Sequence, residues 1–322
     1  RRRRRRHPPA SGGLVGGAGV RKEAVTAYGY LAGWKVVGVL PWRVAWPAFR
    51  AGADRVSKQG AGMEMLRRNL TRVVGAENVT RTLVRDAVRS YARYWLEAFR
   101  LPRIVADVET LRAQMATEVD GVEHLEAAVA RGKGVVLTLP HSGNWDFAGL
   151  WLVDHFGGFT TVAERLKPEV LYEAFVEFRE TLGFEVLALG GGAPAPYARL
   201  KEVLEAGGIV CLLGERDLGR HGVPVTFFGE ATKFPAGPAK LAMDTGAALL
   251  VAHSWYPGGP EGTGWGLKVG APLAVDELQP TVQRVADAFA ANIAAHPADW
   301  HMLQPLWPTD FPSRPRRAAN PG

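Results

Sequence analysis

The sequence predicts an α/β fold: a central, largely parallel or mixed sheet with helices on both faces, preceded by a helical segment. From residue 132 onward, short apolar runs alternate with helical patterns, which is typical of a parallel sheet covered on both sides. Of the 322 residues, 47% are hydrophobic and 22% are charged, a composition that supports a sizeable core. We expect a leader (residues 1–20), a helical segment (21–103), an α/β core (104–312) and a tail (313–322).

The first expected element is a basic leader. It holds an arginine run, two prolines and a glycine-rich stretch, so we expect it to be disordered. No apolar core follows the arginines, so no secretory signal is predicted. Residues 21–103 hold 16 Lys and Arg against 6 Asp and Glu, whereas residues 104–322 hold 17 against 26. This asymmetry suggests a basic surface for a polyanion, either a nucleic acid or an anionic membrane.

The helical segment opens with an apolar stretch, residues 24–40, that contains glycines and Lys35 and ends before a proline. It is shorter than the roughly 20 apolar residues that a membrane-spanning helix needs. Aromatic residues of the type found at membrane interfaces occur in it and after it: Tyr28, Tyr30, Trp34, Trp42 and Trp46. The stretch predicts either a helix apposed to a membrane surface or an amphipathic helix packed on the protein's own core.

A second helix is predicted from apolar residues at spacings of three and four: Val84, Val88, Tyr91, Trp95 and Phe99. Arg85, Arg89 and Arg93 form a stripe on a different side of this helix. We expect the stripe to face solvent, where it would suit an anionic lipid surface.

In the core, apolar and β-branched runs predict strands over residues 134–139, 159–163, 184–189, 209–213 and 248–253. Helices are predicted over residues 145–156, 168–182, 197–206, 235–246 and 281–296. In such folds the chemistry gathers in loops beyond the carboxyl ends of the strands. Polar residues directly after the strands are therefore the candidates for a functional site.

One such loop runs from His141 to Asp146 and reads His-Ser-Gly-Asn-Trp-Asp. The turn can return the Asp146 carboxylate to one imidazole nitrogen, which would fix the tautomer and leave the other nitrogen as a general base. On spacing alone, a capping or core histidine is the alternative. His253 and His301 are predicted to be structural. The sequence has no nucleotide-binding glycine motif, no Gly-x-Ser-x-Gly and no zinc-ligand spacing, so we expect neither a metal nor a cofactor.

Further segments follow this motif in order: Glu-Arg-Leu-Lys-Pro from Glu164, Phe-Arg-Glu-Thr-Leu-Gly-Phe from Phe178, Gly-Glu-Arg-Asp from Gly214 and Phe-Phe-Gly-Glu-Ala-Thr from Phe227. Together with His-x4-Asp they resemble the lysophospholipid acyltransferase superfamily and, within it, the branch that contains the lipid A biosynthesis acyltransferases. The His-x4-Asp motif indicates only the superfamily, whereas the other segments are far more specific. The Gly-Glu-Arg-Asp segment stands where simpler glycerolipid acyltransferases have Phe-Pro-Glu-Gly-Thr.

The resemblance implies transfer of a long-chain acyl group, typically palmitoyl, from the co-substrate acyl-CoA to a mannose hydroxyl of an anionic mannosylated inositol lipid. It implies a peripheral protein at the cytoplasmic face of the plasma membrane, with the membrane surface and no nucleic acid as a partner. By the same residue match, His141 and Asp146 are the catalytic dyad. Glu164, Arg179 and Glu215 are the substrate-binding residues.

The chemistry of the residues agrees with this implication. His141 would remove the proton of a sugar hydroxyl, and backbone N–H groups of residues 142–144 would bind the oxyanion. Coenzyme A leaves as a thiolate, so no covalent intermediate is required, and Cys211 is predicted to be a buried small side chain. Arg179 or Arg165 suits a phosphate, with an ion pair on its own helix as the alternative for Arg179.

Two other functions stay open at this point. An interfacial esterase or thioesterase would use the same dyad with water as the acceptor, although the nucleophile elbow of hydrolases is absent. A nucleic-acid-binding module would use the basic first third of the chain, although no known binding motif occurs there.

Overall fold

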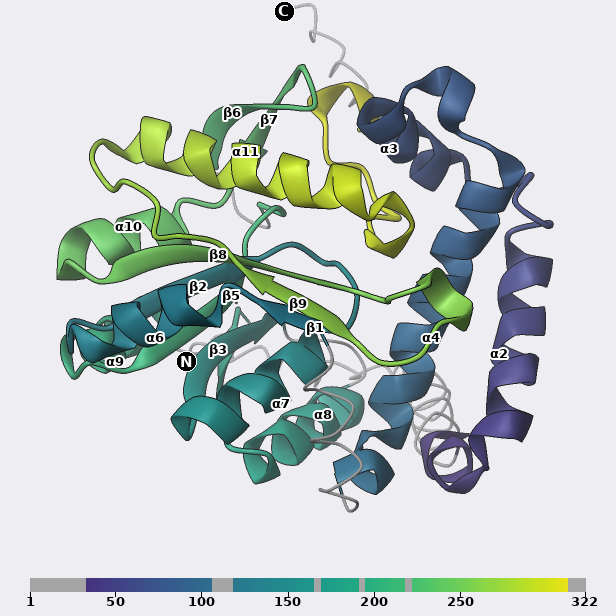
Figure 1. The fold of residues 1–322 in the computed structure, drawn as a ribbon, viewed down its shortest axis with the longest axis horizontal. Helices are drawn as coiled ribbons and strands as arrows, with labels where there is room; N and C mark the ends of the chain where they lie inside the picture. Colours follow the sequence, from purple (N-terminus) through teal and green to yellow (C-terminus); the bar gives the residue numbers. More distant parts are fainter. Residues whose placement is uncertain (1–32, 106–117, 165–168, 191–194, 218–221, 312–322) are drawn as a thin grey trace, which may run out of the picture.

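The computed structural model describes residues 33–105, 118–164, 169–190, 195–217 and 222–311. Within them, a seven-stranded sheet has the order β1-β9-β8-β2-β5-β3-β4 (Figure 1). The strands are β1 (Glu118–Asp120), β2 (Val135–Leu139), β3 (Phe159–Glu164), β4 (Phe184–Leu189), β5 (Ile209–Leu213), β8 (Ala248–Trp255) and β9 (Gly266–Val269). Strands β8 and β9 pair antiparallel, and the other pairs in this sheet are parallel. The predicted fold class is confirmed.

Helices cover both faces of the sheet because successive side chains of its inner strands point to opposite sides. Val136 of β2 packs in one core, whereas its neighbours Val135 and Leu137 pack in the other. The first core includes α9 (Tyr197–Glu205), α10 (Gly237–Thr245) and α11 (Leu278–Ala295). The second includes α6 (Val122–Ala130), α7 (Trp145–Phe156) and α8 (Glu169–Thr181).

Each predicted strand and helix of the core is present, with ends that differ by three residues or fewer. Elements absent from the prediction are β1, α6, β9 and a hairpin of β6 (Val223–Phe227) and β7 (Glu230–Phe234). The hairpin turns through Phe228 and Gly229, both with positive φ (49° and 78°), as the tightest hairpin turns require. Its inward residues, Val223, Val225, Phe227 and Phe234, pack in the core with α11.

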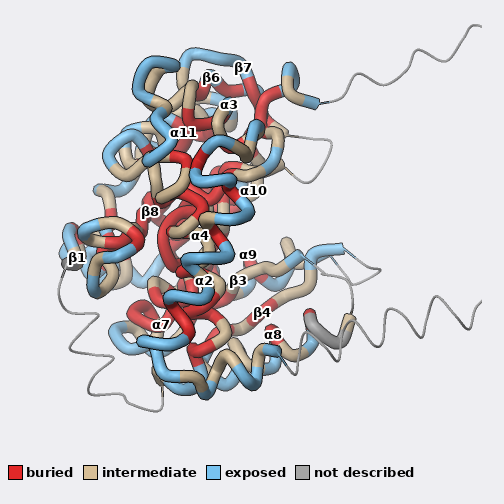
Figure 2. The backbone as a smooth tube through the Cα atoms, turned by 90° about the vertical axis from the view of Figure 1, so that its right-hand side faces the viewer, coloured by how far each residue is buried: buried red, intermediate tan, exposed pale blue. Residues whose placement is uncertain are grey.

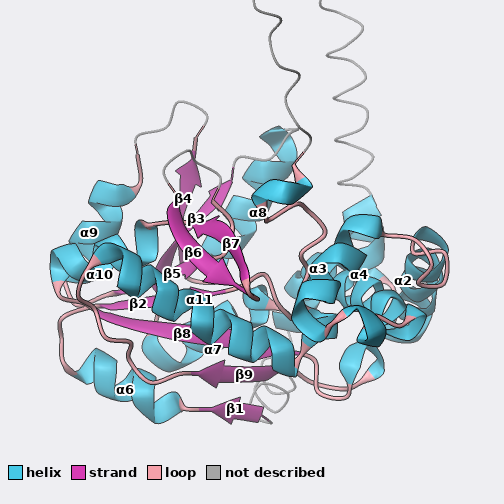
Figure 3. Cartoon of the chain, turned by 90° about the horizontal axis from the view of Figure 1, so that it is seen from above, coloured by secondary structure: helices cyan, strands magenta, loops and turns pink. Residues whose placement is uncertain are grey.

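The helices α2 (Trp42–Val56), α3 (Glu64–Val74) and α4 (Arg81–Val105) lie at one end of the sheet (Figure 3), on the side that faces the viewer in Figure 2. Residues 33–39 are also helical. Helix α4 contacts two short 3-10 helices, Gly259–Glu261 and Pro297–Asp299, which belong to loops that follow β8 and α11. Among the described helices, none combines the length and apolarity needed to cross a bilayer. The expected leader and the tail over residues 313–322 lie outside the described residues.

The arginines of α4 do not form the solvent-facing stripe that the sequence predicts. Arg89 makes two 2.6 Å contacts with the Asp54 carboxylate, and these hydrogen bonds lower the pKa of Asp54 against the opposing effect of burial. Arg93 is only 3% exposed and donates to Glu97 at 2.8 Å. Arg85 contacts its neighbour Asp86 at 3.1 Å. The basic side chains of this stripe are therefore largely occupied by carboxylates of the same molecule.

The tryptophans of the N-terminal helices also differ from the expectation of a shared membrane face. Trp46 is 7% exposed and its indole N–H donates to Glu261 at 2.9 Å. Trp34 stacks on Phe175 with the ring centroids 4.5 Å apart. Trp42 is 37% exposed. Other exposed apolar side chains nearby are those of Val36, Val39 and Val44, whereas Tyr28 and Tyr30 lie outside the described residues.

Candidate active site

His141 and Glu215 meet because two neighbouring strands end in register. Leu139 of β2 is paired with Leu213 of β5, so the residues two positions beyond each strand, His141 and Glu215, lie side by side. The backbone N–H of Gly214 donates to the Leu139 carbonyl at 3.0 Å and extends the ladder by one step. Glu215 Oε1 accepts the backbone N–H of His141 at 2.6 Å and lies 2.8 Å from its Nδ1.

Glu215 fixes which imidazole nitrogen can act as a base. Its side chain is 0% exposed, and burial alone would raise its pKa, but the charge and hydrogen bonds of His141 lower it overall. An ionised carboxylate only accepts hydrogen bonds, so Nδ1 of His141 carries the proton that faces it. The neutral imidazole then has its lone pair on Nε2, the nitrogen available to a substrate. Glu215 thus occupies the position on the imidazole that the sequence analysis predicted for Asp146.

Asp146 instead joins three helices. Its Oδ1 accepts from Nε of Arg179 at 2.8 Å, and its Oδ2 accepts from Nη2 of Arg179 and from the Tyr94 hydroxyl, both at 3.2 Å. Burial alone would lower the pKa of Arg179, but the charge and hydrogen bonds of the Asp146 carboxylate raise this pKa overall. Burial, and then the charge of Asp146, raises the pKa of Tyr94 well above its usual value. Asp146 on α7 therefore ties α8 and α4 together beside His141.

The turn after His141 is clamped by the loops around it. The backbone N–H of Ser142 donates to the Pro140 carbonyl at 2.8 Å and that of Gly143 to the Asp299 carbonyl at 2.9 Å. These two groups are therefore already hydrogen-bonded, whereas the predicted oxyanion site over residues 142–144 also included the N–H of Asn144 and stays a prediction. Gly143 has φ 57°, and a Cβ there would lie 2.5 Å from the carbonyl carbon of Ser254, so only glycine fits.

A cavity of about 300 Å³ opens beside His141. Its walls include aromatic and aliphatic side chains, among them Tyr91, Trp95, Phe159, Phe175, Phe184, Val186 and Leu213. Of the predicted site residues, His141, Asp146, Glu164 and Arg179 line this cavity, and Glu215 lies behind the imidazole. Glu164 is the last residue of β3 and is exposed. Arg165 lies outside the described residues.

Two further cavity residues, Arg216 and His301, were not among the predicted site residues. The backbone N–H of His301 donates to the His141 carbonyl at 2.8 Å, and its Nε2 lies 2.9 Å from Oγ of Ser90. The Ser90 hydroxyl donates in turn to Asp299 at 2.6 Å. Burial, and then the charge of His141, lowers the pKa of His301 to about 3, so this ring is neutral. Both histidines face the cavity although they are far apart in sequence.

Cys211 forms part of the cavity wall and is a poor candidate for a nucleophile. Burial raises the pKa of its thiol to about 12, which keeps it protonated near neutral pH.

His253 is a buried residue of strand β8, and neither of its ring nitrogens has a hydrogen-bond partner among the described residues, whereas Nε2 of His301 contacts Ser90. Within the same residues, no group of three or more potential ligand side chains could hold a metal ion.

Together these features define an α/β enzyme in which an oriented imidazole can activate a hydroxyl beside an apolar cavity. Residues 20–309 match the family described as bacterial lipid A biosynthesis acyltransferase. The chain belongs to this family and is an acyltransferase, which confirms the resemblance seen in its motifs.

Similar relatives share most of their length with this chain. The phosphatidylinositol mannoside acyltransferase of Mycolicibacterium smegmatis is 53% identical over 298 residues, which cover 91% of this chain and 95% of the relative. The protein of the same name from Mycobacterium tuberculosis is 52% identical over 300 residues, 92% of each chain.

Proposed function

We propose that this acyltransferase moves a long-chain acyl group, palmitoyl being the expected one, from acyl-CoA to a mannose hydroxyl of a phosphatidylinositol mannoside. The main support for the proposal is the His141–Glu215 pair, which leaves Nε2 of His141 available as a base beside an apolar cavity. The names and the high identity of the two mycobacterial relatives support the choice of acceptor.

In the proposed reaction, Nε2 of His141 removes the proton of the mannose hydroxyl as its oxygen attacks the thioester carbonyl. Glu215 holds Nδ1–H and stabilises the imidazolium that forms. The tetrahedral intermediate then loses the C–S bond, coenzyme A departs as a thiolate, and the imidazolium can return the proton to it. The acyl group passes directly to the sugar, without an acyl-enzyme intermediate.

The remaining cavity residues are assigned by their chemistry. The apolar walls suit the acyl chain, since burying methylene groups is favourable by about 0.8 kcal/mol each. Arg216, next to Glu215, is our candidate for stabilising the oxyanion, because the backbone N–H groups of Ser142 and Gly143 are already bonded. Glu164 at the end of β3 suits hydrogen bonds with the hydroxyls of the sugar.

We further propose that the protein acts peripherally at the cytoplasmic face of the plasma membrane, where its lipid acceptor would be anchored. The exposed apolar side chains at residues 36–44, together with the exposed Lys35 and Arg43, support this location. Replacing Trp42 by Ala should weaken sedimentation with anionic vesicles, whereas Trp46→Ala is a poor probe because Trp46 is buried.

Release of coenzyme A from palmitoyl-CoA tests the proposal against the esterase alternative. We expect release to depend on a phosphatidylinositol mannoside in the vesicles. Equal rates of release with and without this acceptor would identify water as the acceptor and contradict the proposed transfer. The His141→Ala protein, checked for its fold by circular dichroism, is the control for background thioester hydrolysis.

A further inference from the structure

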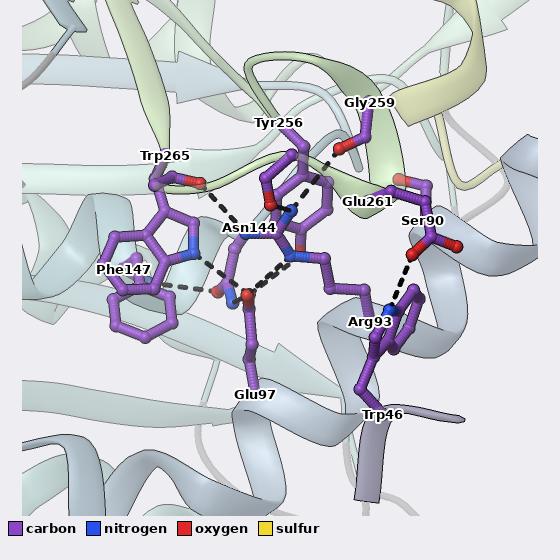
Figure 4. Close-up of polar contacts among 12 residues, drawn as sticks. Trp46, Ser90, Arg93, Glu97, Asn144, Phe147, Tyr256, Gly259, Glu261 and Trp265 are labelled. Carbon is purple, nitrogen blue, oxygen red and sulfur yellow. Dashed lines mark hydrogen bonds and ion pairs between the residues drawn. The ribbon is translucent and has the colours of Figure 1, made fainter. Parts of the chain in front are cut away.

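A buried polar cluster includes Asn144, which lies in the turn between His141 and Asp146 in the sequence (Figure 4). Its centre is Glu97 of α4, which is 2% exposed. Oε1 of Glu97 accepts from Nε of Arg93 at 2.8 Å. Oε2 accepts from three donors: Nδ2 of Asn144 at 2.7 Å, the hydroxyl of Tyr256 at 3.0 Å and the indole N–H of Trp265 at 3.1 Å. Both oxygens of Glu97 are therefore acceptors for donors that converge from four residues.

Asn144 links this cluster to the first turn of α7. It is the N-cap residue of α7, and its side-chain oxygen accepts the backbone N–H groups of Asp146 at 3.1 Å and Phe147 at 3.2 Å. Its amide nitrogen donates to Glu97. One planar group thus connects α4 to the start of the helix that carries Asp146.

The direction of the Asn144 amide is fixed by Glu97 together with the first N–H groups of α7. An asparagine side chain has a donor end and an acceptor end, and either end could face a neutral hydrogen-bonding group. A carboxylate accepts only, so Glu97 attracts the NH2 end and turns the oxygen toward the free N–H groups of α7. The N–H groups of α7 and the carboxylate of Glu97 on α4 therefore select the same direction of the amide and hold it from both ends.

Arg93 compensates for burying the Glu97 charge. It is 3% exposed, and its remaining N–H groups donate to the carbonyls of Gly262 at 2.9 Å and Gly264 at 3.0 Å. Its guanidinium carbon lies 3.9 Å from the centre of the Tyr256 ring. A buried charge is tolerated when it is paired and hydrogen-bonded in this way.

We propose that Glu97 is a positioning residue for acyl transfer, an inference that rests on the proposed function. By fixing the amide of Asn144, it holds the first turn of α7, and with it Trp145 and Asp146, beside His141. Asp146 in turn holds Arg179, and Trp145, Asp146 and Arg179 all line the cavity. A reacting group displaced by about 1 Å can lower a rate by about a hundredfold, so a small rotation of this turn would be seen in turnover.

The test uses the full-length protein, palmitoyl-CoA and vesicles containing a phosphatidylinositol mannoside. Wild-type transfer is measured first, and its absence would reject the proposed function before Glu97 is considered. Glu97→Gln keeps the shape of the side chain but places an NH2 group against donors. We expect kcat to fall by about ten- to a hundredfold, while the KM for palmitoyl-CoA stays within about twofold.

Tyr256→Phe is the matched control. It also removes one hydrogen bond to Glu97, but it leaves the Asn144 amide in place, so we expect near wild-type kcat even if the melting temperature falls. Equal losses of kcat in Glu97→Gln and Tyr256→Phe, at equal melting temperatures, would show a general structural role and overturn the proposal. Wild-type kcat in Glu97→Gln would overturn it as well.

A charge-conserving exchange provides the second variant. In Glu97→Gln/Asn144→Asp the donor and acceptor ends are swapped: the glutamine NH2 donates to one oxygen of the aspartate, and the other oxygen caps α7. The cluster keeps one negative charge for Arg93. We expect this double variant to recover much of the kcat that Glu97→Gln loses, and a kcat no higher than that of the single variant would contradict the positioning role.

If Glu97→Gln does not fold, Asn144→Ser replaces it as the test. Serine can still cap α7 but loses the link to Glu97, so this variant should show the same fall in kcat. Wild-type kcat in Asn144→Ser would overturn the proposal.

Discussion

Asp146→Asn separates the structural role of Asp146 from a role in orienting the imidazole. Asparagine keeps the shape of the side chain but removes the charge that faces Arg179. The side chains of Asp146 and Arg179 are 4% and 19% exposed, and the nearest contact between them is 2.8 Å. The variant therefore leaves a largely buried guanidinium without its carboxylate.

The expected loss of stability follows from this burial. Removing one partner of a buried ion pair costs about 3–5 kcal/mol, and the partial exposure of Arg179 favours the lower end. For a chain of 322 residues, whose unfolding entropy scales with length, about 3 kcal/mol lowers the melting temperature by roughly 4–5 °C. Thermal and urea unfolding measure both quantities. Arg179→Met and the double variant complete a cycle in which the double variant should be more stable than the sum of the single losses predicts.

The same variant distinguishes two assignments of the carboxylate that serves His141. If Asp146 oriented the imidazole, Asp146→Asn would lower kcat by about 10⁴ at nearly unchanged stability. Because Glu215 holds Nδ1 of His141, we expect Asp146→Asn to lower the stability of the protein. We expect kcat to fall only to the extent that the turn after His141 shifts. An unchanged melting temperature together with a 10⁴-fold loss of kcat would show that Asp146, and not Glu215, orients the imidazole.

Further predictions concern Glu215, Cys211 and His253. Glu215→Gln should lower kcat by about 10³–10⁴, since it removes the charge that stabilises the imidazolium, and wild-type kcat would show that Glu215 is not the orienting group. Cys211→Ala should keep transfer, and intact mass with palmitoyl-CoA alone should show no acylated wild-type protein; a stoichiometric adduct would indicate a covalent route. Burial lowers the pKa of His253 from 6.5 to about 3 in the folded protein. Between these two pH values the unfolded chain binds one proton more than the folded protein, so the stability falls as the pH drops through this range. His253→Phe should therefore reduce the loss of unfolding free energy between pH 7 and pH 4 by up to about 3 kcal/mol, and an unchanged loss would show that His253 does not contribute.

The sequence predicts the core elements well because apolar runs and helical periodicity are local signals. Strands β1 and β9 are three and four residues long, too short for a pattern to stand out. The hairpin of β6 and β7 alternates clearly, with buried residues at positions 223, 225 and 227. Its Phe-Gly turn is not one of the usual hairpin dipeptides, and this explains why it was not predicted.

The pairing of His141 with Glu215 could not be read from local spacing. It depends on β2 and β5 being neighbours and on Leu139 facing Leu213, which are properties of the assembled sheet. The spacing from His141 to Asp146 is conspicuous because it is short, and it suggested the nearer carboxylate. His301 carries no local signal either, since a tertiary contact brings it to the His141 carbonyl.

The charge asymmetry of the sequence also has a partly internal explanation. Arg72 of α3 lies 2.6 Å from Asp310 and 3.0 Å from Glu230, two carboxylates from the acidic part of the chain. Arg50 of α2 contacts Glu261 at 3.5 Å. The basic first third is thus partly neutralised by the acidic remainder, which a count of charges along the sequence cannot show.

In the proposed reaction, His141 directs an acyl group from acyl-CoA to a mannose hydroxyl. The most direct test of this transfer is mass spectrometry of the lipid product formed from palmitoyl-CoA and a purified phosphatidylinositol mannoside, with fragmentation to locate the new ester. We predict one added palmitoyl group on a mannose residue, absent when the His141→Ala protein is used. Free palmitate as the sole product, an acyl group elsewhere on the lipid, or the same product from the His141→Ala protein would contradict this transfer.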